Sequence, residues 1–361
     1  MRLFSLALPY LLIVTFYSGE FNNFTARKVQ TINESPYAGS AVALISAYDT
    51  DKHTEKEFEG AVNLIKKISK KHIWPWVFFN RLVGFKEGKD GQSLGKISDK
   101  PYFKRIKGID IYNEAGALED FYNIWRISLK SAKRLGSPGI IIDPEPYNNY
   151  KDYQLSYLAK ELGRPEEEVK QRLKAVGAEL ADIAEKEYPD ATLWFLLTGF
   201  ANPTRKLNPF ASEEYTTVTY IIEGMLIRAK EKGLLIKIIS GGESSLGYCH
   251  ENYEAFQKRI SGRNEKYGPL LSAYPNLRLG GVIAPWADPA KRFDWMLKWR
   301  CGESEFKDIN DFKKPIELLL RSYDYVWLYG AGVAPFDPYD AGVAVPYNKA
   351  IKDVMKSIPR R

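Results

Sequence analysis

Short apolar runs alternate with amphipathic segments along most of this chain, and this alternation limits the folds that it can adopt. The runs have continuous Val, Ile, Leu and Phe character, which indicates strands that are buried on both faces, as in a parallel sheet covered by helices. The predicted strands are Ala41–Ala47, Trp76–Phe79, a weaker third run at Lys107–Ile111, Gly139–Ile142, Leu193–Leu197, Leu235–Ile239, Leu279–Ile283 and Tyr325–Leu328.

The segments between these runs carry helix periodicity and helix end signals. Thr54 followed by Glu57 fits a capping box, and Gly136 is a natural helix stop. No Gly-rich loop follows any run, which weakens nucleotide-binding alternatives, and seven or eight strand-then-helix units favour a barrel over an open doubly wound sheet. The pattern therefore predicts an α/β fold, a (β/α)8 TIM barrel in a single domain with elaborated loops. The predicted helices are Thr54–Lys70, Ala117–Leu135, Pro165–Glu187, Glu213–Lys232, Tyr253–Ser272, Asp311–Tyr323 and Lys349–Ser357.

The N-terminus resembles a secretory signal peptide. Met1-Arg2 supplies one positive charge, an apolar run extends over Leu3–Tyr17, and Ser18-Gly19 supplies small residues. The run is shorter than the ~18–20 residues of a membrane span, and a retained membrane anchor is the alternative. We expect a secreted or extracytoplasmic protein with a signal peptide at residues 1–19, an N-terminal arm or linker at 20–38, and a barrel catalytic domain at 39–361.

Charge and composition exclude some partners and cofactors. The net charge is +7, but the positive side chains are dispersed along predicted helices and interleaved with Glu, so we expect solvated faces and no nucleic-acid partner. The three histidines show no zinc-ligand spacing, so no metal or organic cofactor is expected. Cys249 and Cys301 are too few for a disulfide scaffold and are either bridged or free. The sequence predicts no membrane span after leader removal and leaves the oligomeric state open.

The strongest chemical signal follows the predicted strand Gly139–Ile142. That strand runs directly into Asp143 and Glu145, and residues i and i+2 of a strand share a face. At the C-terminal end of a barrel strand this face is at the mouth, where barrel enzymes build their active sites. Two carboxyl groups held side by side push their proton affinities apart, which suits a general acid with a supporting carboxylate. The alternative is a Pro-rich turn in which Asp143 caps the segment that follows.

The stretch Ile142-Asp143-Pro144-Glu145-Pro146-Tyr147 resembles the end of the D-x-x-D-x-D-x-E motif of family 18 chitinases. In that family the last two acids lie at the end of the fourth barrel strand. The Glu is the proton donor, and the preceding Asp orients the acetamido group of the substrate. The resemblance implies that Glu145 is the acid and Asp143 its helper. The two earlier acids of the motif would fall at Pro138 and Ile141, so the implied function is that of a barrel glycoside hydrolase in general.

A third acid, Glu243, follows the predicted sixth strand. It comes directly after Gly241 and Gly242, which permit close backbone approach, and it leaves the strand toward the same barrel face. Strands four and six lie two spacings of ~4.8 Å apart, so their side chains can converge across the mouth. Carboxyl groups ~5–5.5 Å apart suit a retaining glycosidase and ~6.5–9.5 Å an inverting one; the sequence does not choose between them. The alternative is a Gly-rich turn with Glu243 in a surface ion pair.

Aromatic residues make up 14% of the chain, and several of them follow predicted strands. Trp327 in the last strand resembles the floor on which barrel glycosidases hold a sugar ring, because ring faces suit the apolar face of a pyranose. Core packing is the alternative role for this side chain. The other predicted substrate-binding residues are Tyr147, Tyr248, Trp286, Asp288 and Asn80.

Together these residues predict a glycoside hydrolase that cleaves a poly- or oligosaccharide without a cofactor. Glu145 is the predicted general acid/base, Asp143 tunes it or orients the substrate, and Glu243 is the nucleophile or the base that activates water. On a 2-acetamido sugar, the acetamido group would be the internal nucleophile. Two alternatives stay open: a non-catalytic carbohydrate-binding barrel, and a metal-dependent hydrolase with the three acids as ligands, which the lack of well-placed histidines disfavours.

Overall fold

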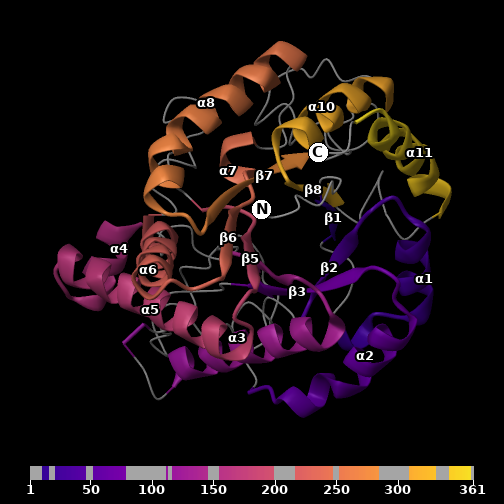
Figure 1. The fold of residues 1–361 in the computed structure, drawn as a ribbon. Coiled ribbons are helices and arrows are strands. Elements are labelled where there is room, and N and C mark those ends of the chain that lie inside the picture. The colour runs from indigo at the N-terminus through magenta and orange to yellow at the C-terminus, as the bar shows by residue number, and fades with distance from the viewer. Residues whose placement is uncertain are drawn as a thin grey trace, which may run out of the picture.

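The strands of the computed structural model form one parallel sheet that curls into a barrel (Figure 1). Each strand pairs with the next in the sequence, and β1 (Tyr10–Thr15) also pairs along its length with β8 (Tyr325–Gly330). Between them are β2 (Gly39–Ala43), β3 (His72–Phe78), β4 (Gly139–Asp143), β5 (Thr192–Phe195), β6 (Lys237–Ser240) and β7 (Leu277–Ile283). The structure describes residues 10–15, 21–45, 52–78, 111–112, 116–144, 154–198, 216–246, 252–283, 309–330 and 341–358.

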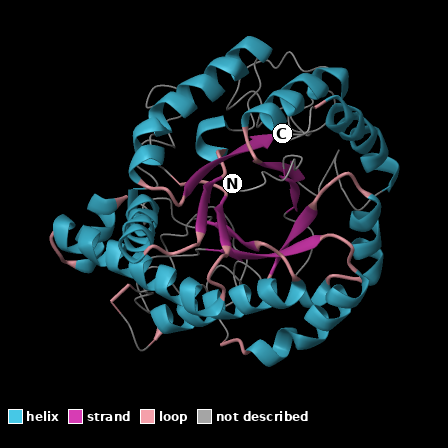
Figure 2. Ribbon diagram, in the orientation of Figure 1, coloured by secondary structure: helices cyan, strands magenta, loops and turns pink. Residues whose placement is uncertain are grey.

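Helices surround the sheet on its outer side (Figure 2). This arrangement confirms the predicted α/β barrel, because each strand is followed by helix before the next parallel strand begins. The helices in the described part of the chain are η1 (Phe21–Asn23), α1 (Ala26–Glu34), α2 (Glu55–Ile68), α3 (Ala117–Leu135), α4 (Leu155–Leu162), α5 (Glu166–Glu187), α6 (Thr216–Lys232), α7 (Glu243–Leu246), α8 (Tyr253–Ala273), α10 (Ile309–Ser322) and α11 (Ala341–Ser357).

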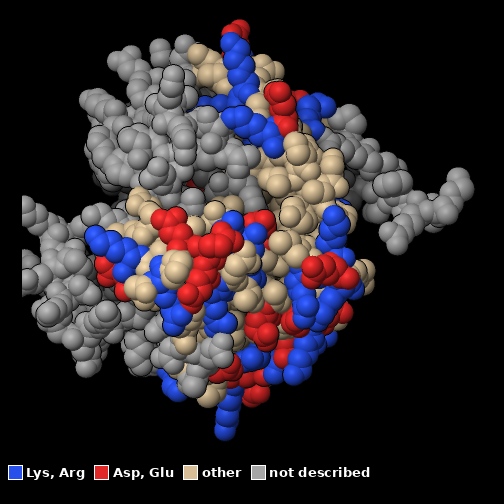
Figure 3. All heavy atoms as spheres, turned by 90° about the vertical axis from the view of Figure 1, so that its left-hand side faces the viewer, with Lys and Arg blue, Asp and Glu red and all other residues tan. Residues whose placement is uncertain are grey.

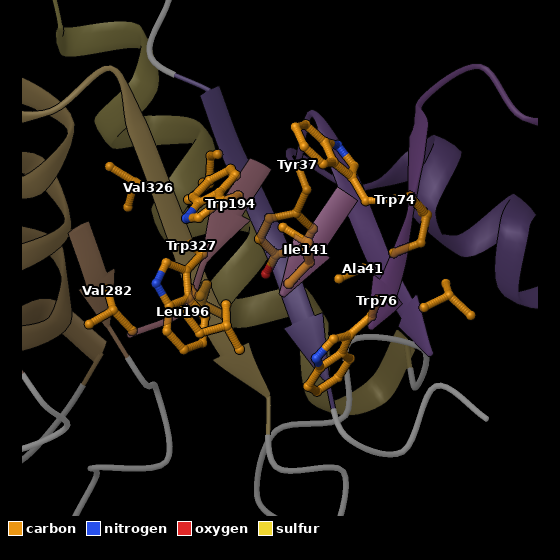
Figure 4. Close-up of a cluster of buried hydrophobic side chains, with 14 of the residues drawn as sticks. Tyr37, Ala41, Trp74, Trp76, Ile141, Trp194, Leu196, Val282, Val326 and Trp327 are labelled. Carbon is orange, nitrogen blue, oxygen red and sulfur yellow. The ribbon is translucent and has the colours of Figure 1, made fainter. Parts of the chain in front are cut away.

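Large apolar side chains fill the interior of the barrel. Trp74 of β3 and Trp194 of β5 meet edge to face, with their ring centroids 5.8 Å apart. Figure 4 shows these two rings in one cluster with Ile141 and Trp327. Side chains alternate along a strand, so Ile141 faces this interior while its neighbour Ile142 packs in the outer layer. The interior is therefore a packed core, and a ligand site has to lie at a rim.

In the outer layer, α5 and α6 pack closely because glycines occupy their contact. A Cβ atom on Gly177 would lie 1.9 Å from the carbonyl oxygen of Ile221, and one on Gly224 would lie 2.1 Å from that of Lys174. Beyond the glycines, Arg228 of α6 donates two hydrogen bonds to the Asp182 carboxylate on α5 at 2.6–2.9 Å. These bonds, followed by the one from Lys232, lower the pKa of Asp182.

Charged side chains on the outer helices are interleaved rather than gathered by sign. Figure 3 shows Lys and Arg mixed with Asp and Glu on the face that carries α4 and α6. This agrees with the dispersed charge expected from the sequence. Ion pairs on α5 and α6 join Lys170 to Glu167, Lys174 to Glu223 and Lys232 to Asp182, at 3.2, 3.0 and 2.8 Å.

Local end signals fixed several helix boundaries. Gly136 ends α3 with φ of +70°, a left-handed conformation that favours glycine, as expected of a helix stop. The capping box at Thr54 forms only in part, because its hydroxyl donates to the Glu57 carboxylate at 3.3 Å and makes no bond to the backbone. Helix α11 begins at Ala341, ahead of the predicted Lys349.

The apolar run near the N-terminus, predicted as part of a signal peptide, contributes β1. Tyr10–Thr15 pairs with β2 on one side and β8 on the other, and Leu11 is fully buried. A leader and a doubly buried strand have the same apolar composition, so the sequence did not distinguish them. Cleavage after residue 19 would remove β1, so the predicted cleavage and this sheet exclude each other. The secreted location, which depended on the leader, stays a prediction.

The described part of residues 20–38 belongs to the domain and is not the predicted arm or linker. Helix α1 begins after Thr25, whose hydroxyl accepts a hydrogen bond from the Lys28 amide at 3.4 Å. The segment was misassigned because its few apolar residues are spread through a polar stretch and become a buried face only when the helix forms. Its fully buried side chains are Phe21, Val29, Ile32 and Tyr37.

The weak strand expected at Lys107–Ile111 is not a strand where the structure describes it. Ile111 lies in a turn with Tyr112, and residues 107–110 lie outside the described residues. Because β1 precedes the first predicted strand, the first and second predicted strands are β2 and β3. The third place in the sheet is therefore taken by β3. The predicted fourth to eighth strands keep their places. In the described part of the chain, no helix is both long and apolar enough to cross a membrane.

Shortening Leu11 tests whether β1 belongs to the folded protein. Leu11→Ala should lower the free energy of unfolding by about 2–5 kcal/mol, because it leaves a cavity in the core. Leu64→Ala is the matched control, since Leu64 is 43% exposed on α2, and its effect should stay within about 0.5 kcal/mol. Urea unfolding followed by circular dichroism measures both. Equal stability of the two variants would mean that residues 10–15 are not part of the barrel.

Candidate active site at the carboxyl ends of the strands

Asp143 is the last residue of β4 and lies at the rim of the barrel. It is 1% exposed and pairs in register with Phe78 of β3. Because Asp143 and Ile141 are two residues apart in one strand, they share the face that Ile141 turns to the barrel interior. The carboxyl group of Asp143 therefore belongs to the mouth, one layer above the packed core. This is the position predicted from the sequence.

Most of the other predicted site residues cannot be placed. The predicted acid, Glu145, follows Asp143 by two residues and lies outside the described residues. The predicted substrate-binding residues Tyr147, Tyr248, Trp286, Asp288 and Asn80 also lie outside them, as do Cys249 and Cys301. The structure thus describes Asp143, Glu243 and Trp327 of the predicted site.

Glu243 begins α7, on the turn that follows β6. The turn continues the pairing of β6 with β5 beyond the strand ends: the Gly241 amide donates to the Phe195 carbonyl at 2.7 Å, and the Glu243 amide donates to the Leu196 carbonyl at 3.1 Å. The Leu246 amide closes the first turn of α7 on the Gly242 carbonyl at 2.7 Å. The backbone of Glu243 is therefore fixed by its own hydrogen bond, and the residue does not lie at the tip of an unsupported loop.

The two glycines before Glu243 are required by the shape of this turn. A Cβ atom on Gly241 would lie 2.6 Å from the carbonyl oxygen of Phe195 and 2.7 Å from that of Leu196. Gly242 has φ of +92°, in the left-handed region that favours glycine. One glycine therefore allows close contact with β5, and the other allows the chain to turn into α7.

Trp327 supports the same turn from the barrel interior, on β8, which only β7 separates from β6. Its side chain on β8 is fully buried, and its Nε1–H donates to the Gly241 carbonyl at 2.9 Å. The ring meets Tyr329 edge to face at 6.1 Å. These contacts favour the core-packing alternative, because a fully buried ring offers no face to a sugar. The role that emerges for Trp327 is to hold the turn that carries Glu243.

The register of β4, β5 and β6 places the two described acids at the same end of the barrel. Ile142 pairs with Phe195, and Phe195 pairs with Ser240, so these three residues lie at one level. Asp143 is the next residue along β4, and Glu243 follows Ser240 on the turn after β6. One strand separates the two acids, as the sequence predicted for strands four and six.

A buried polar cluster beneath this turn was missed by the sequence analysis. Its members are Ser240 at the end of β6, Thr198 after β5, and Arg263 and Tyr267 on α8, and all four are buried. A signal was present in the sequence: Arg263 falls between Ile260 and Tyr267 at the spacing of the apolar face of α8. In the described part of the chain, no group of three or more His, Cys, Asp or Glu residues could hold a metal ion.

Comparisons with known proteins show a likeness of fold. No family model matches the sequence, and no curated protein matches it. The GH5-4 broad-specificity endoglucanase from an uncultured bacterium has a similar structure, with a TM-score of 0.54 at 9% identity over 99% of this chain and 98% of that chain. At this identity the likeness shows an α/β barrel fold alone.

Other solved barrels are similar at a weaker level. The catalytic domain of β-amylase from Paenibacillus polymyxa has a TM-score of 0.49 at 9% identity, over 98% of this chain and 100% of that chain. A sugar phosphate isomerase/epimerase from Parabacteroides distasonis has a TM-score of 0.42 at 12% identity, over 97% and 99%. Likeness at this level does not bear on function. The resemblance to family 18 chitinases still depends on the short stretch from Ile142 to Tyr147 alone.

Removing the indole N–H of Trp327 should loosen the Glu243 turn. Trp327→Phe leaves the Gly241 carbonyl without this donor, which should cost about 1–3 kcal/mol of unfolding free energy and speed amide exchange in residues 241–246. Trp125→Phe is the matched control, because it removes a similar buried bond from Trp125 Nε1 to the Leu180 carbonyl, 3.2 Å long, between α3 and α5. Hydrogen exchange read by mass spectrometry compares the variants. Equal exchange of the turn in both would contradict the support role.

Proposed function

We propose that this protein is a glycoside hydrolase on a (β/α)8 barrel, with a poly- or oligosaccharide as its substrate. The observation that carries the proposal is the placement of Asp143: a buried carboxyl group at the end of a central strand, on the face that leads into the mouth. Glu145 follows two residues later, and Glu243 lies on a braced turn at the same end of the barrel. Acids on two strand ends of one barrel suit two-carboxylate catalysis of glycoside cleavage.

In this proposal Glu145 protonates the glycosidic oxygen as the bond breaks, and in the retaining version it later removes a proton from the water that hydrolyses the glycosyl-enzyme. Asp143 is buried, and it either tunes the proton affinity of Glu145 or orients a substrate group that reaches the base of the mouth. Glu243 either attacks the anomeric carbon as the nucleophile of a retaining mechanism, or activates water as the base of an inverting one. No step requires a metal or an organic cofactor.

Replacing Glu145 tests the proposal most directly. Glu145→Gln removes the transferable proton with little change of shape, and kcat/KM on the responsive polysaccharide should fall at least about 100-fold. Reducing-sugar release from a panel of β-glucans, mannans, α-glucans and chitin identifies that substrate and gives the rate. Glu166→Gln, at the exposed start of α5, is the matched control and should keep full activity.

Two results would contradict this proposal, one for the role of Glu145 and one for hydrolase activity itself. Glu145→Gln that keeps more than about one tenth of the activity would remove Glu145 from the chemistry. Binding of an oligosaccharide that stays intact after prolonged incubation with wild-type protein would instead favour the non-catalytic carbohydrate-binding barrel, for which the missing half of the D-x-E motif is the motivation.

Covalent trapping separates the two versions of the mechanism. If Glu243 is the nucleophile, a 2-fluoro glycoside with a good leaving group should inactivate the protein and leave its label on Glu243. If the substrate supplies an acetamido nucleophile, a thiazoline sugar analogue should inhibit and the 2-fluoro reagent should leave no label. Peptide mapping by mass spectrometry locates the label, and Glu243→Gln is the control that should abolish it.

A further inference from the structure

Arg263 occupies a position on α8 where the helix would be expected to carry an apolar side chain. Phe256, Ile260, Arg263 and Tyr267 form the buried face of this helix, at the spacing of an amphipathic helix. Arg263 is only 1% exposed. A buried guanidinium loses its hydration, and burial of a charge is unfavourable unless other groups satisfy it. The contacts that satisfy Arg263 therefore indicate its purpose.

Backbone carbonyls at two strand ends accept the hydrogen bonds of Arg263. One terminal nitrogen donates to the carbonyl of Gly280 on β7 at 2.7 Å. The other donates to the carbonyl of Ser240 on β6 at 2.7 Å and to its hydroxyl at 3.2 Å. The ring centroids of Tyr267 and Tyr323 each lie 5.2 Å from the guanidinium carbon of Arg263. Among the described residues, no carboxylate forms an ion pair with Arg263. The guanidinium thus joins β6 to β7 at the point where β6 ends.

Three hydroxyl groups complete the cluster around Ser240. Thr198 Oγ1 lies 2.9 Å from Ser240 Oγ and 2.9 Å from Tyr267 Oη, and the last two atoms are 3.0 Å apart. The triangle ties the segment after β5 to the end of β6 and to α8. Arg263 Nε has no hydrogen-bond partner among the described residues, whereas both terminal nitrogens and the three hydroxyl groups are bonded and restrict the backbone around them.

The turn that carries Glu243 rests directly on this cluster. A Cβ atom on Gly242 would lie 3.1 Å from the Gly280 carbonyl oxygen and 3.4 Å from the guanidinium carbon of Arg263. Arg263 therefore binds Ser240 on one side of the turn, and on the other side it fills the space that a side chain at position 242 would enter. Only Gly241 intervenes, and Trp327 binds its carbonyl.

We propose that Arg263 is a positioning residue for Glu243, which fixes the β6–α7 turn so that the carboxylate points into the mouth. The inference deepens the proposed function and rests on it for the role of Glu243. An apolar side chain would be enough to pack this face of the helix. The forked guanidinium can, in addition, bond the carbonyls of two strands and support the turn. When a catalytic group is displaced, the rate of the reaction falls even if the substrate still binds.

Kinetics of Arg263→Lys tests this role. Lysine keeps the charge and loses the fork, so kcat should fall by about 10- to 100-fold while KM changes less than about threefold. Tyr267→Phe, which removes only a hydroxyl, should act in the same direction more weakly and guards against misfolding of the Arg263 variant. Arg228→Lys is the matched control, because it removes a forked contact to Asp182 far from the mouth and should leave kcat and KM unchanged.

Amide hydrogen exchange gives a readout that does not depend on activity. Arg263→Lys should speed exchange at the amides of Gly241 and Glu243, which bind Phe195 and Leu196, and leave α5 unchanged. Unchanged exchange at these amides, or activity equal to that of Arg228→Lys, would overturn the positioning role. Failure of the wild-type protein to cleave any polysaccharide of the panel would overturn the proposed hydrolase instead, and the exchange result would still decide whether Arg263 fixes the turn.

Discussion

Closure of the sheet depends on β1, whose backbone pairs with β2 on one side and β8 on the other. Without this strand β2 and β8 would each present an unpaired edge, and neither would be held beside the other. The position of β8 matters beyond the sheet, because Trp327 extends from it to the carbonyl of Gly241. The N-terminal strand β1 therefore helps to position β8, and β8 supports the turn that carries Glu243 through the side chain of Trp327. The same closure fills the interior with indole rings, so polar chemistry is confined to the rim.

The β6–α7 turn concentrates features that local stability alone would not favour. It contains a glycine in the left-handed region, a second glycine in close contact with β5, and a guanidinium buried against it without a carboxylate partner among the described residues. Each feature costs folding free energy or conformational entropy when taken singly. Together they leave the turn one conformation, braced by β5, β7, β8 and α8. Such rigid support beneath an acidic residue is what a preorganised catalytic group requires.

Much of the barrel could be predicted from the sequence because its signals are local. The continuous apolar runs gave β4 to β8 in the correct order, and the run ending in Asp143 gave that residue its place at the rim. The first strand could not be recognised, since β1 differs from a leader only through its partners, which lie 27 residues away on β2 and 315 residues away on β8. The bond from Trp327 to Gly241 joins residues 86 positions apart, and no local pattern encodes it. Arg263 was readable in principle, as a charge on an apolar helix face.

A single residue directly after β5, Leu196, connects the segments that carry the two acids described by the structure. The Leu196 amide donates to the Ile142 carbonyl at 2.9 Å, and the Leu196 carbonyl accepts from the Glu243 amide at 3.1 Å. Asp143 directly follows Ile142. The two hydrogen bonds of Leu196 therefore fix the backbone at Asp143 relative to the backbone at Glu243. Their spacing is then set by strand geometry, which is stiff, and less by side-chain rotamers. Retaining and inverting glycosidases differ by only about 1–4 Å in the separation of their carboxyl groups. In the proposed mechanism the acid that works with Glu243 is Glu145, two residues beyond Asp143, so this backbone link fixes the strand end from which that separation is set.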